Sequence, residues 1–127
     1  MNTGPNALAH RVLVVDDEAM VRLLVVYALQ EAGFVVQEAA EAAGALALLR
    51  ADDSIRLMVT DVGLPGVDGW TLADQARDCR PDIQVLFMTG DPDAAVDDPA
   101  RAKGFALIAK PFDLEELAAR AGELLAP

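Results

Sequence analysis

Apolar residues along this chain fall into short continuous runs separated by longer stretches with a different spacing. Five runs rich in Val, Leu, Ile, Met or Phe are Arg11–Val15, Phe34–Gln37, Leu57–Thr60, Ile83–Met88 and Phe105–Ala109. Strands of a parallel sheet are buried on both faces and therefore read as continuous apolar runs. The runs predict five such strands.

Between the runs, apolar residues recur every three or four positions, which is the spacing of amphipathic helices. The predicted helices are Ala19–Ala32, Glu41–Arg50, Asp68–Cys79 and Asp113–Leu125. Strands that alternate with helices indicate βαβ units and a parallel sheet. We therefore predict an α/β fold that is flavodoxin-like and doubly wound, (βα)5, with the strand order 2-1-3-4-5.

Two segments depart from this regular pattern. Between Thr89 and Phe105, Pro92 could begin a helix, but Pro99 would interrupt it, so a fourth helix there should be short or irregular. Residues 1–10 are mostly small, polar or turn-forming, and we expect a flexible N-terminal tail. With 127 residues the chain is about one domain long, and the predicted folded domain covers residues 11–126.

Charge and composition narrow the possible functions. Ten basic residues against 21 acidic ones give a net charge of −11, which disfavours binding to nucleic acid or to an anionic membrane surface. No apolar run approaches the roughly 18–20 residues of a membrane helix. The single cysteine, Cys79, excludes an internal disulfide. We expect a soluble, cytoplasmic domain without membrane insertion.

Reactive side chains stand at the carboxyl ends of four predicted strands. Asp16 and Asp17 follow the first strand, Asp61 the third, Thr89 the fourth and Lys110 the fifth. In the order 2-1-3-4-5 these four strands are neighbours. Because open α/β sheets form their sites beyond the carboxyl ends of the strands, we expect these side chains to converge.

Together these side chains suit phosphoryl transfer. Crowded carboxylates repel one another, and Mg²⁺ relieves that repulsion because it prefers hard oxygen ligands and a phosphate. Asp61 could then act as a nucleophile and form an aspartyl phosphate. Thr89 and Lys110 could hold the other phosphoryl oxygens. Each residue alone has an ordinary structural interpretation, and the prediction depends on the combination.

The chain resembles the receiver domain of bacterial two-component response regulators. The matching segments are VLVVDDE at Val12–Glu18, TDVGLPGVDGW at Thr60–Trp70, VLFMTGD at Val85–Asp91 and IAKPFDLEEL at Ile108–Leu117. The resemblance implies a stand-alone receiver or the receiver of a hybrid kinase. It also implies a phosphorelay protein that takes a phosphoryl group from a histidine kinase, a phosphotransfer protein or a small phosphodonor.

The resemblance also implies roles for single residues. Asp61 would be the phosphoacceptor and a ligand of Mg²⁺. Asp17 would bind the ion directly, Asp16 largely through water, and Gly63 through its backbone carbonyl. The domain would not be an enzyme that acts on other molecules. It would catalyse only the transfer of the phosphoryl group to its own Asp61 and the later loss of that group.

The implied switch machinery lies on the last two strands. Thr89 would follow the phosphoryl group, switching a partner-binding surface, and Lys110 would bridge that group and the acids. The bond from Lys110 to Pro111 would be cis. Leu107 stands where the family usually has Tyr or Phe, so the chain departs from the family's usual coupling of the threonine to an aromatic residue.

The first predicted helix offers a possible docking surface. Its expected buried stripe is Val21, Leu24, Val25, Ala28, Leu29 and Ala32. Beside this stripe, Leu23, Val26 and Tyr27 lie on another face. They are either a docking patch for a kinase or scattered surface hydrophobes, which are common.

Two other functions remain as alternatives. A Mg²⁺-dependent phosphohydrolase with an aspartyl nucleophile would need a second acid two residues after Asp61, where the chain has Gly63. A pseudo-receiver, never phosphorylated and acting only through protein contacts, is disfavoured by the presence of Asp17, Asp61 and Lys110.

Overall fold

The computed structural model describes residues 11–64, 66–90 and 105–126. Its sheet consists of β1 (Arg11–Val15), β2 (Val35–Ala39), β3 (Ile55–Asp61), β4 (Gln84–Thr89) and β5 (Ala106–Ala109). The strands are all parallel, in the order β2-β1-β3-β4-β5. The predicted α/β fold and strand order are therefore confirmed.

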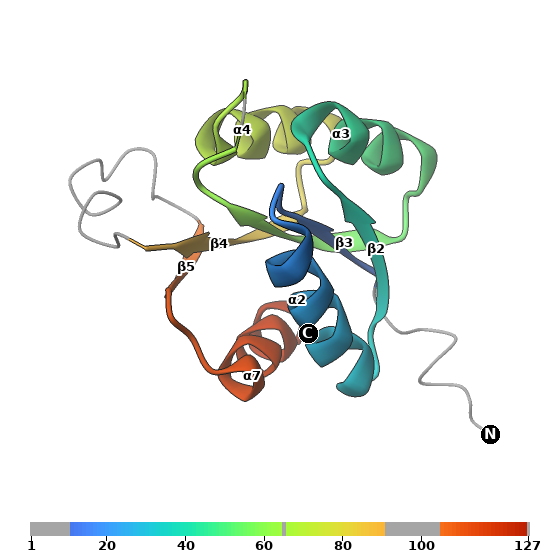
Figure 1. Cartoon of the computed structure of the whole chain (residues 1–127). Helices are drawn as coiled ribbons and strands as arrows, with labels where there is room; N and C mark the ends of the chain where they lie inside the picture. Colours follow the sequence, from blue (N-terminus) through green and yellow to red (C-terminus); the bar gives the residue numbers. More distant parts are fainter. Residues whose placement is uncertain (1–10, 65, 91–104, 127) are drawn as a thin grey trace.

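Helices cover both faces of the sheet (Figure 1). They are α2 (Ala19–Glu31), α3 (Ala42–Ala51), α4 (Gly69–Cys79) and α7 (Leu114–Leu125). α3 and α4 lie on one face, while α2 and α7 lie on the other. The predicted irregular helix between Thr89 and Phe105 and the predicted tail fall almost wholly outside the described residues. No described helix is long and apolar enough to cross a membrane.

The alternation of side chains along each strand produces two hydrophobic cores. Leu13 and Val15 of β1 point into the core beneath α3 and α4, whereas Val12 and Val14 point into the core beneath α2 and α7. Phe87 fills the first core, with Trp70 and Phe105 packed against its ring at centroid distances of 4.3 and 5.3 Å. The first core therefore contains a chain of three aromatic rings.

The helices begin with different capping arrangements. Asp68 caps α4 by accepting a hydrogen bond from the Thr71 N–H at 2.8 Å, and Asp113 accepts one from the Glu115 N–H of α7 at 2.8 Å. Glu18 is the residue before α2, and its side chain forms no such cap. The Glu18 carboxylate is therefore not held by a capping hydrogen bond to its own helix.

Candidate functional site

The parallel sheet brings the predicted reactive residues to one edge. Asp16 follows β1, Asp61 ends β3, Thr89 ends β4 and Lys110 follows β5. The backbone N–H of Lys110 donates to the Thr89 carbonyl at 2.6 Å, which joins the ends of the last two strands. The peptide bond between Lys110 and Pro111 is cis, as the resemblance implied.

Asp61 is held through both of its carboxylate oxygens. The Lys110 Nζ donates to Oδ2 at 2.7 Å, and the backbone N–H of Gly63 donates to Oδ1 at 2.9 Å. The side chains of Asp61 and Lys110 are only 15% and 26% exposed, so water screens this ion pair less than it would at the open surface. The carboxylate is thus oriented at the rim of the sheet.

The charge of Lys110 is stabilised at this site. Burial by itself would lower the pKa of the Lys110 ammonium. The hydrogen bond to Asp61 and the negative charges around it outweigh that effect, so the pKa is raised. Lys110 therefore stays positively charged beside Asp61.

Asp16 is a buried acid with an unpaired oxygen. Its side chain has no exposed surface. Oδ1 accepts a hydrogen bond from the Glu18 N–H at 2.8 Å, while the buried Oδ2 has no hydrogen-bond partner within the described residues. Burial raises the pKa of Asp16, and the negative charge of Asp61 adds to that rise. A cation bound beside Asp16 would offset both the cost of burying its charge and the repulsion from Asp61.

Three carboxylates come close together at this edge. Asp16, Glu18 and Asp61 each offer an oxygen within 4.8 Å of the other two. Hard oxygen donors of this kind suit Mg²⁺ or another hard divalent cation, so the residues present fit the expected ion. Asp17 is exposed and is not part of this described cluster. Gly63 contacts Asp61 through its N–H.

Glu18 belongs to this acidic cluster, and the sequence interpretation gave it no role. It lies within the VLVVDDE segment, directly after the two aspartates that received roles. The signal was the third consecutive acid, but three acids in a row are also typical of a solvated turn. Its placement depends on the backbone turn from β1 into α2.

Two further residues shape the loops that carry the acids. The Arg22 Nη1 donates to the Asp16 carbonyl at 2.7 Å, and its Nε donates to Glu38 Oε1 at 2.9 Å. Gly69 lies against the segment after Asp61, where a Cβ would stand 2.5 Å from the Asp61 carbonyl oxygen and 2.9 Å from the Cα of Val62. Only glycine permits this close approach.

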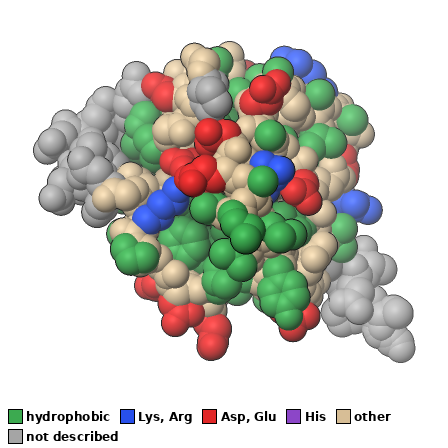
Figure 2. Space-filling view, viewed as in Figure 1, with side chains coloured by type: hydrophobic (Ala, Val, Ile, Leu, Met, Phe, Trp, Pro, Cys, Tyr) green, Lys and Arg blue, Asp and Glu red, His purple; other side chains and the backbone are tan. Residues whose placement is uncertain are grey.

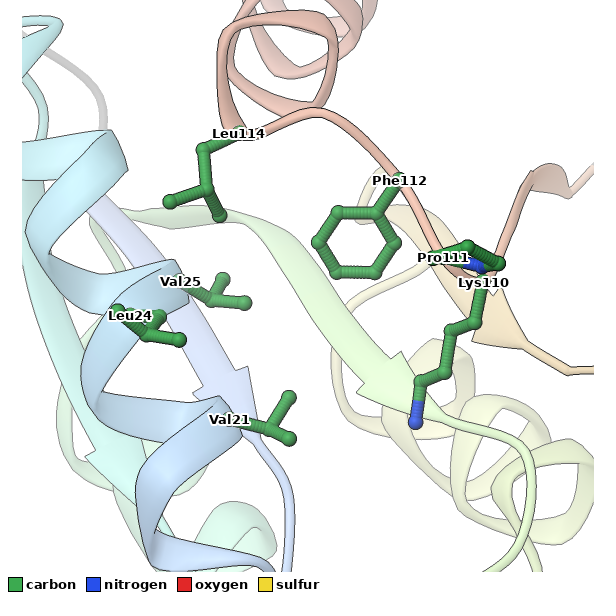
Figure 3. A pocket seen from close by; sticks show the side chains of 7 residues that line it. All are labelled: Val21, Leu24, Val25, Lys110, Pro111, Phe112 and Leu114. Atoms are coloured by element: carbon green, nitrogen blue, oxygen red, sulfur yellow. The ribbon is translucent and has the colours of Figure 1, made fainter.

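An apolar pocket of about 480 Å³ lies next to the ion pair. Its lining residues are Val21, Leu24, Val25, Lys110, Pro111, Phe112 and Leu114. The Phe112 ring points toward α2 across this pocket (Figure 3). A second pocket of about 360 Å³ continues between α2 and α7 and shares Leu114 with the first. We call the two together the α2–α7 groove.

The predicted orientation of α2 about its axis was partly wrong. Val26, expected on the surface, is buried, and Leu24, expected in the buried stripe, is 50% exposed. Leu23 and Tyr27 are exposed as predicted. Figure 2 shows hydrophobic side chains gathered on the side where α2 and α7 lie. The apolar surface of α2 therefore faces partly into the groove instead of wholly into the core.

Comparison with known proteins identifies the family. The chain matches the response regulator receiver domain family model over residues 12–122. It is 39% identical over 117 residues to the sensor kinase CckA of Brucella abortus, covering 90% of this chain and 12% of the kinase. It is 34% identical over 113 residues to the response regulator receiver protein CpdR of the same organism, covering 84% and 89% of the two chains.

Solved structures lead to the same family. The receiver domain of the hybrid histidine kinase CckA superposes with a TM-score of 0.78 at 32% identity, covering 91% of this chain and 99% of that one. The chain belongs to the response regulator receiver domain family of two-component systems, and it is a signalling domain as distinct from a conventional enzyme.

Proposed function

We propose that this domain accepts a phosphoryl group on Asp61 from a histidine kinase, a phosphotransfer protein or a small phosphodonor. The observation that carries the proposal is the Lys110–Asp61 ion pair at 2.7 Å beside a buried acid whose Oδ2 is unpaired among the described residues. An ordinary surface salt bridge would not require the second feature. The family shown above supports the same chemistry.

In the proposed reaction an Asp61 carboxylate oxygen attacks the phosphorus atom. A new P–O bond forms while the bond from phosphorus to the donor, a histidine nitrogen or an acetyl oxygen, breaks and leaves its electron pair on the donor. The Lys110 ammonium offsets negative charge on the phosphoryl oxygens, because it already faces Asp61. Thr89 ends the neighbouring strand, and we propose that its hydroxyl binds a phosphoryl oxygen.

The proposed metal ligands are the side chains of Asp16, Asp17 and Asp61 and the backbone carbonyl of Gly63. Bound Mg²⁺ would supply positive charge that lets an anionic phosphoryl group approach the acids. Asp16 contributes a buried oxygen without a described partner. Asp17 directly follows Asp16 and is exposed on the same loop.

We propose that the kinase or phosphotransfer protein docks in the α2–α7 groove. The groove places exposed apolar side chains such as Leu24 next to Lys110, and buried apolar contacts at the centre of an interface carry much of its affinity. Leu24→Arg should slow transfer from a phosphorylated kinase while leaving labelling by acetyl phosphate unchanged. Val35→Arg is the control, because Val35 is an exposed apolar residue of β2 outside the groove. A similar slowing by Val35→Arg would contradict this assignment.

Three other features also remain predictions. These are domain boundaries at residues 11 and 126, a cytoplasmic location, and a partner-binding surface that changes when Asp61 is phosphorylated. Self-catalysed loss of the phosphoryl group is expected as well, since water can attack the same phosphorus.

Mass spectrometry of the intact protein tests the proposed function. After incubation with acetyl phosphate and Mg²⁺, wild type should gain a single phosphoryl group, whereas Asp61→Asn should gain none. Asp82→Asn is the matched control, because Asp82 is exposed and lies before β4, away from the cluster. An adduct on Asp61→Asn, or no Mg²⁺-dependent adduct on wild type, would contradict the proposal.

A further inference from the structure

We propose that Glu18 is an additional acidic side chain that binds the divalent cation, beside Asp16 and Asp61. This inference rests on the proposed Mg²⁺-dependent function and adds a residue that the family resemblance did not assign. It predicts that the affinity for the cation depends on the length and charge of this one side chain.

The first argument is the backbone that carries Glu18. Its N–H donates to Asp16 Oδ1 at 2.8 Å, so the turn after β1 ties the two residues together. Glu18 stands immediately before α2, in an extended conformation, but its carboxylate does not cap that helix. The carboxylate lies instead with those of Asp16 and Asp61, with oxygens of all three within 4.8 Å of one another.

The second argument is independent of the clustering. Asp16 is completely buried, and its Oδ2 lacks a partner within the described part of the chain. Leaving a buried carboxylate oxygen unpaired is costly unless something binds there. Among the described residues, the Lys110 ammonium is bonded to Asp61, and the Arg22 guanidinium binds the backbone carbonyl of Asp16, not its carboxylate. An unpaired buried oxygen beside two other carboxylates points to a ligand at this edge.

The third argument is charge. Three ionised carboxylates and one ammonium sum to two negative charges, which one divalent cation neutralises. Mg²⁺ in proteins keeps several waters and binds acids both directly and through those waters. Oxygens within 4.8 Å of one another are compatible with either arrangement. Glu18 is one methylene longer than aspartate, which gives it the reach to join the two acids from its own turn.

Thermal unfolding measured over a series of MgCl2 concentrations tests the inference without a spectroscopic probe at the site. A ligand that binds only the folded protein raises the free energy of unfolding by RT ln(1 + L/Kd), where L is the ligand concentration. The rise in Tm with MgCl2 concentration therefore gives Kd. The variants are Glu18→Gln, which removes the charge, and Glu18→Asp, which keeps the charge but shortens the side chain. Glu41→Gln removes the same charge from an exposed residue before α3.

Glu18→Gln should weaken Mg²⁺ binding about tenfold, Glu18→Asp should weaken it by a smaller factor, and Glu41→Gln should leave it within about twofold. Equal Kd values for Glu18→Gln and Glu41→Gln would overturn the inference. So would wild-type affinity in Glu18→Asp, because the effect would then be a long-range field and not binding by this side chain. No Mg²⁺ response in wild type would instead overturn the proposed metal-dependent function itself.

Discussion

The two ends of the sheet carry acids in opposite electrostatic states. At the carboxyl end, Asp16 is fully buried with an unpaired Oδ2 and has a raised pKa, mainly through burial. Near the amino ends of β1 and β3, Asp52 accepts hydrogen bonds from the Ser54 N–H and from Gln37, at 2.8 and 2.9 Å. The pKa of Asp52 is lowered, first by its hydrogen bonds to Ser54.

This difference in pKa separates a functional end of the sheet, at the carboxyl ends of the strands, from a structural end. A group whose charged form is well hydrogen-bonded favours folding, whereas a buried charge without a full set of partners opposes it. A buried acid with a raised pKa beside other carboxylates is typical of sites that bind or react. The domain therefore gives up some stability at the carboxyl end in order to keep its acids available for a ligand.

The largest effect is expected for Asp16→Asn. A folded pKa raised above the unfolded value makes ionised Asp16 destabilising at neutral pH, and that penalty falls as the pH drops toward the folded pKa. The neutral amide should therefore raise Tm by about 4 °C in EDTA. It should also lower the rate of phosphorylation by acetyl phosphate with Mg²⁺ by about 10- to 100-fold.

Circular dichroism melts in EDTA and intact-protein mass after labelling with Mg²⁺ measure these two effects on one preparation of each variant. Asp82→Asn, an exposed acid before β4, controls for the change in net charge and should alter neither. A lower Tm for Asp16→Asn in EDTA at pH 7 would show that the ionised carboxylate is well solvated in the folded protein, and the contrast between the two ends would fail.

The carboxyl end could be predicted from sequence because four of the five strands deliver a reactive residue at their ends. Once the apolar runs indicate parallel strands in the order 2-1-3-4-5, the positions of Asp16, Asp61, Thr89 and Lys110 follow. The predicted bounds of the four helices were correct to within one residue at each end. Strand ends and helix bounds depend on local signals, which the sequence carries directly.

Glu18 and the α2–α7 groove depend on orientations that local signals do not determine. Which face of α2 meets the sheet is set by how the helix rests on the sheet and α7, so Val26 is buried and Leu24 is half exposed. Each residue turns a helix by about 100°, so a small rotation exchanges neighbouring positions between core and surface. Where the Glu18 carboxylate points likewise depends on the turn from β1 into α2.

A smaller effect is expected for Gly69→Ala, which tests how tightly the loop after Asp61 is held. The added Cβ would meet the Asp61 carbonyl oxygen at 2.5 Å and the Cα of Val62 at 2.9 Å. Because both are backbone atoms, the loop or α4 must move, and unfolding free energy should fall by about 1–3 kcal/mol. Chemical denaturation measures this change, and acetyl phosphate labelling should slow in the same variant.

Gly122→Ala is the matched control, since a Cβ at that position of α7 meets nothing within 4 Å. Alanine is the better helix former, so this variant should gain up to about 1 kcal/mol. A Gly69→Ala variant as stable as wild type would show that the loop carrying Asp61 adjusts freely.

Arg22→Ala should have a moderate effect confined to the functional end of the sheet. It removes the hydrogen bonds to the Asp16 carbonyl and to Glu38, and stability should fall by about 1 kcal/mol. Because the turn that carries the acids loses its anchor, labelling by acetyl phosphate should slow several-fold, with partial rescue by Arg22→Lys. Arg50→Ala, which changes an exposed residue of α3, is the control. Loss of stability with an unchanged labelling rate would limit Arg22 to a structural role.

The smallest effect is expected for Asp52→Ala at the structural end of the sheet. Because the pKa of Asp52 is lowered in the folded state, its stabilisation is fully present above the unfolded pKa near 3.8 and is lost as the pH falls through the folded pKa. At pH 7 the variant should melt only a few degrees below wild type, because Asp52 is partly exposed and water screens its charge. The two melting curves should converge by about pH 2. Asp82→Ala should match wild type throughout. A difference in Tm that persists unchanged at pH 2 would mean that Asp52 stabilises the fold through uncharged contacts alone.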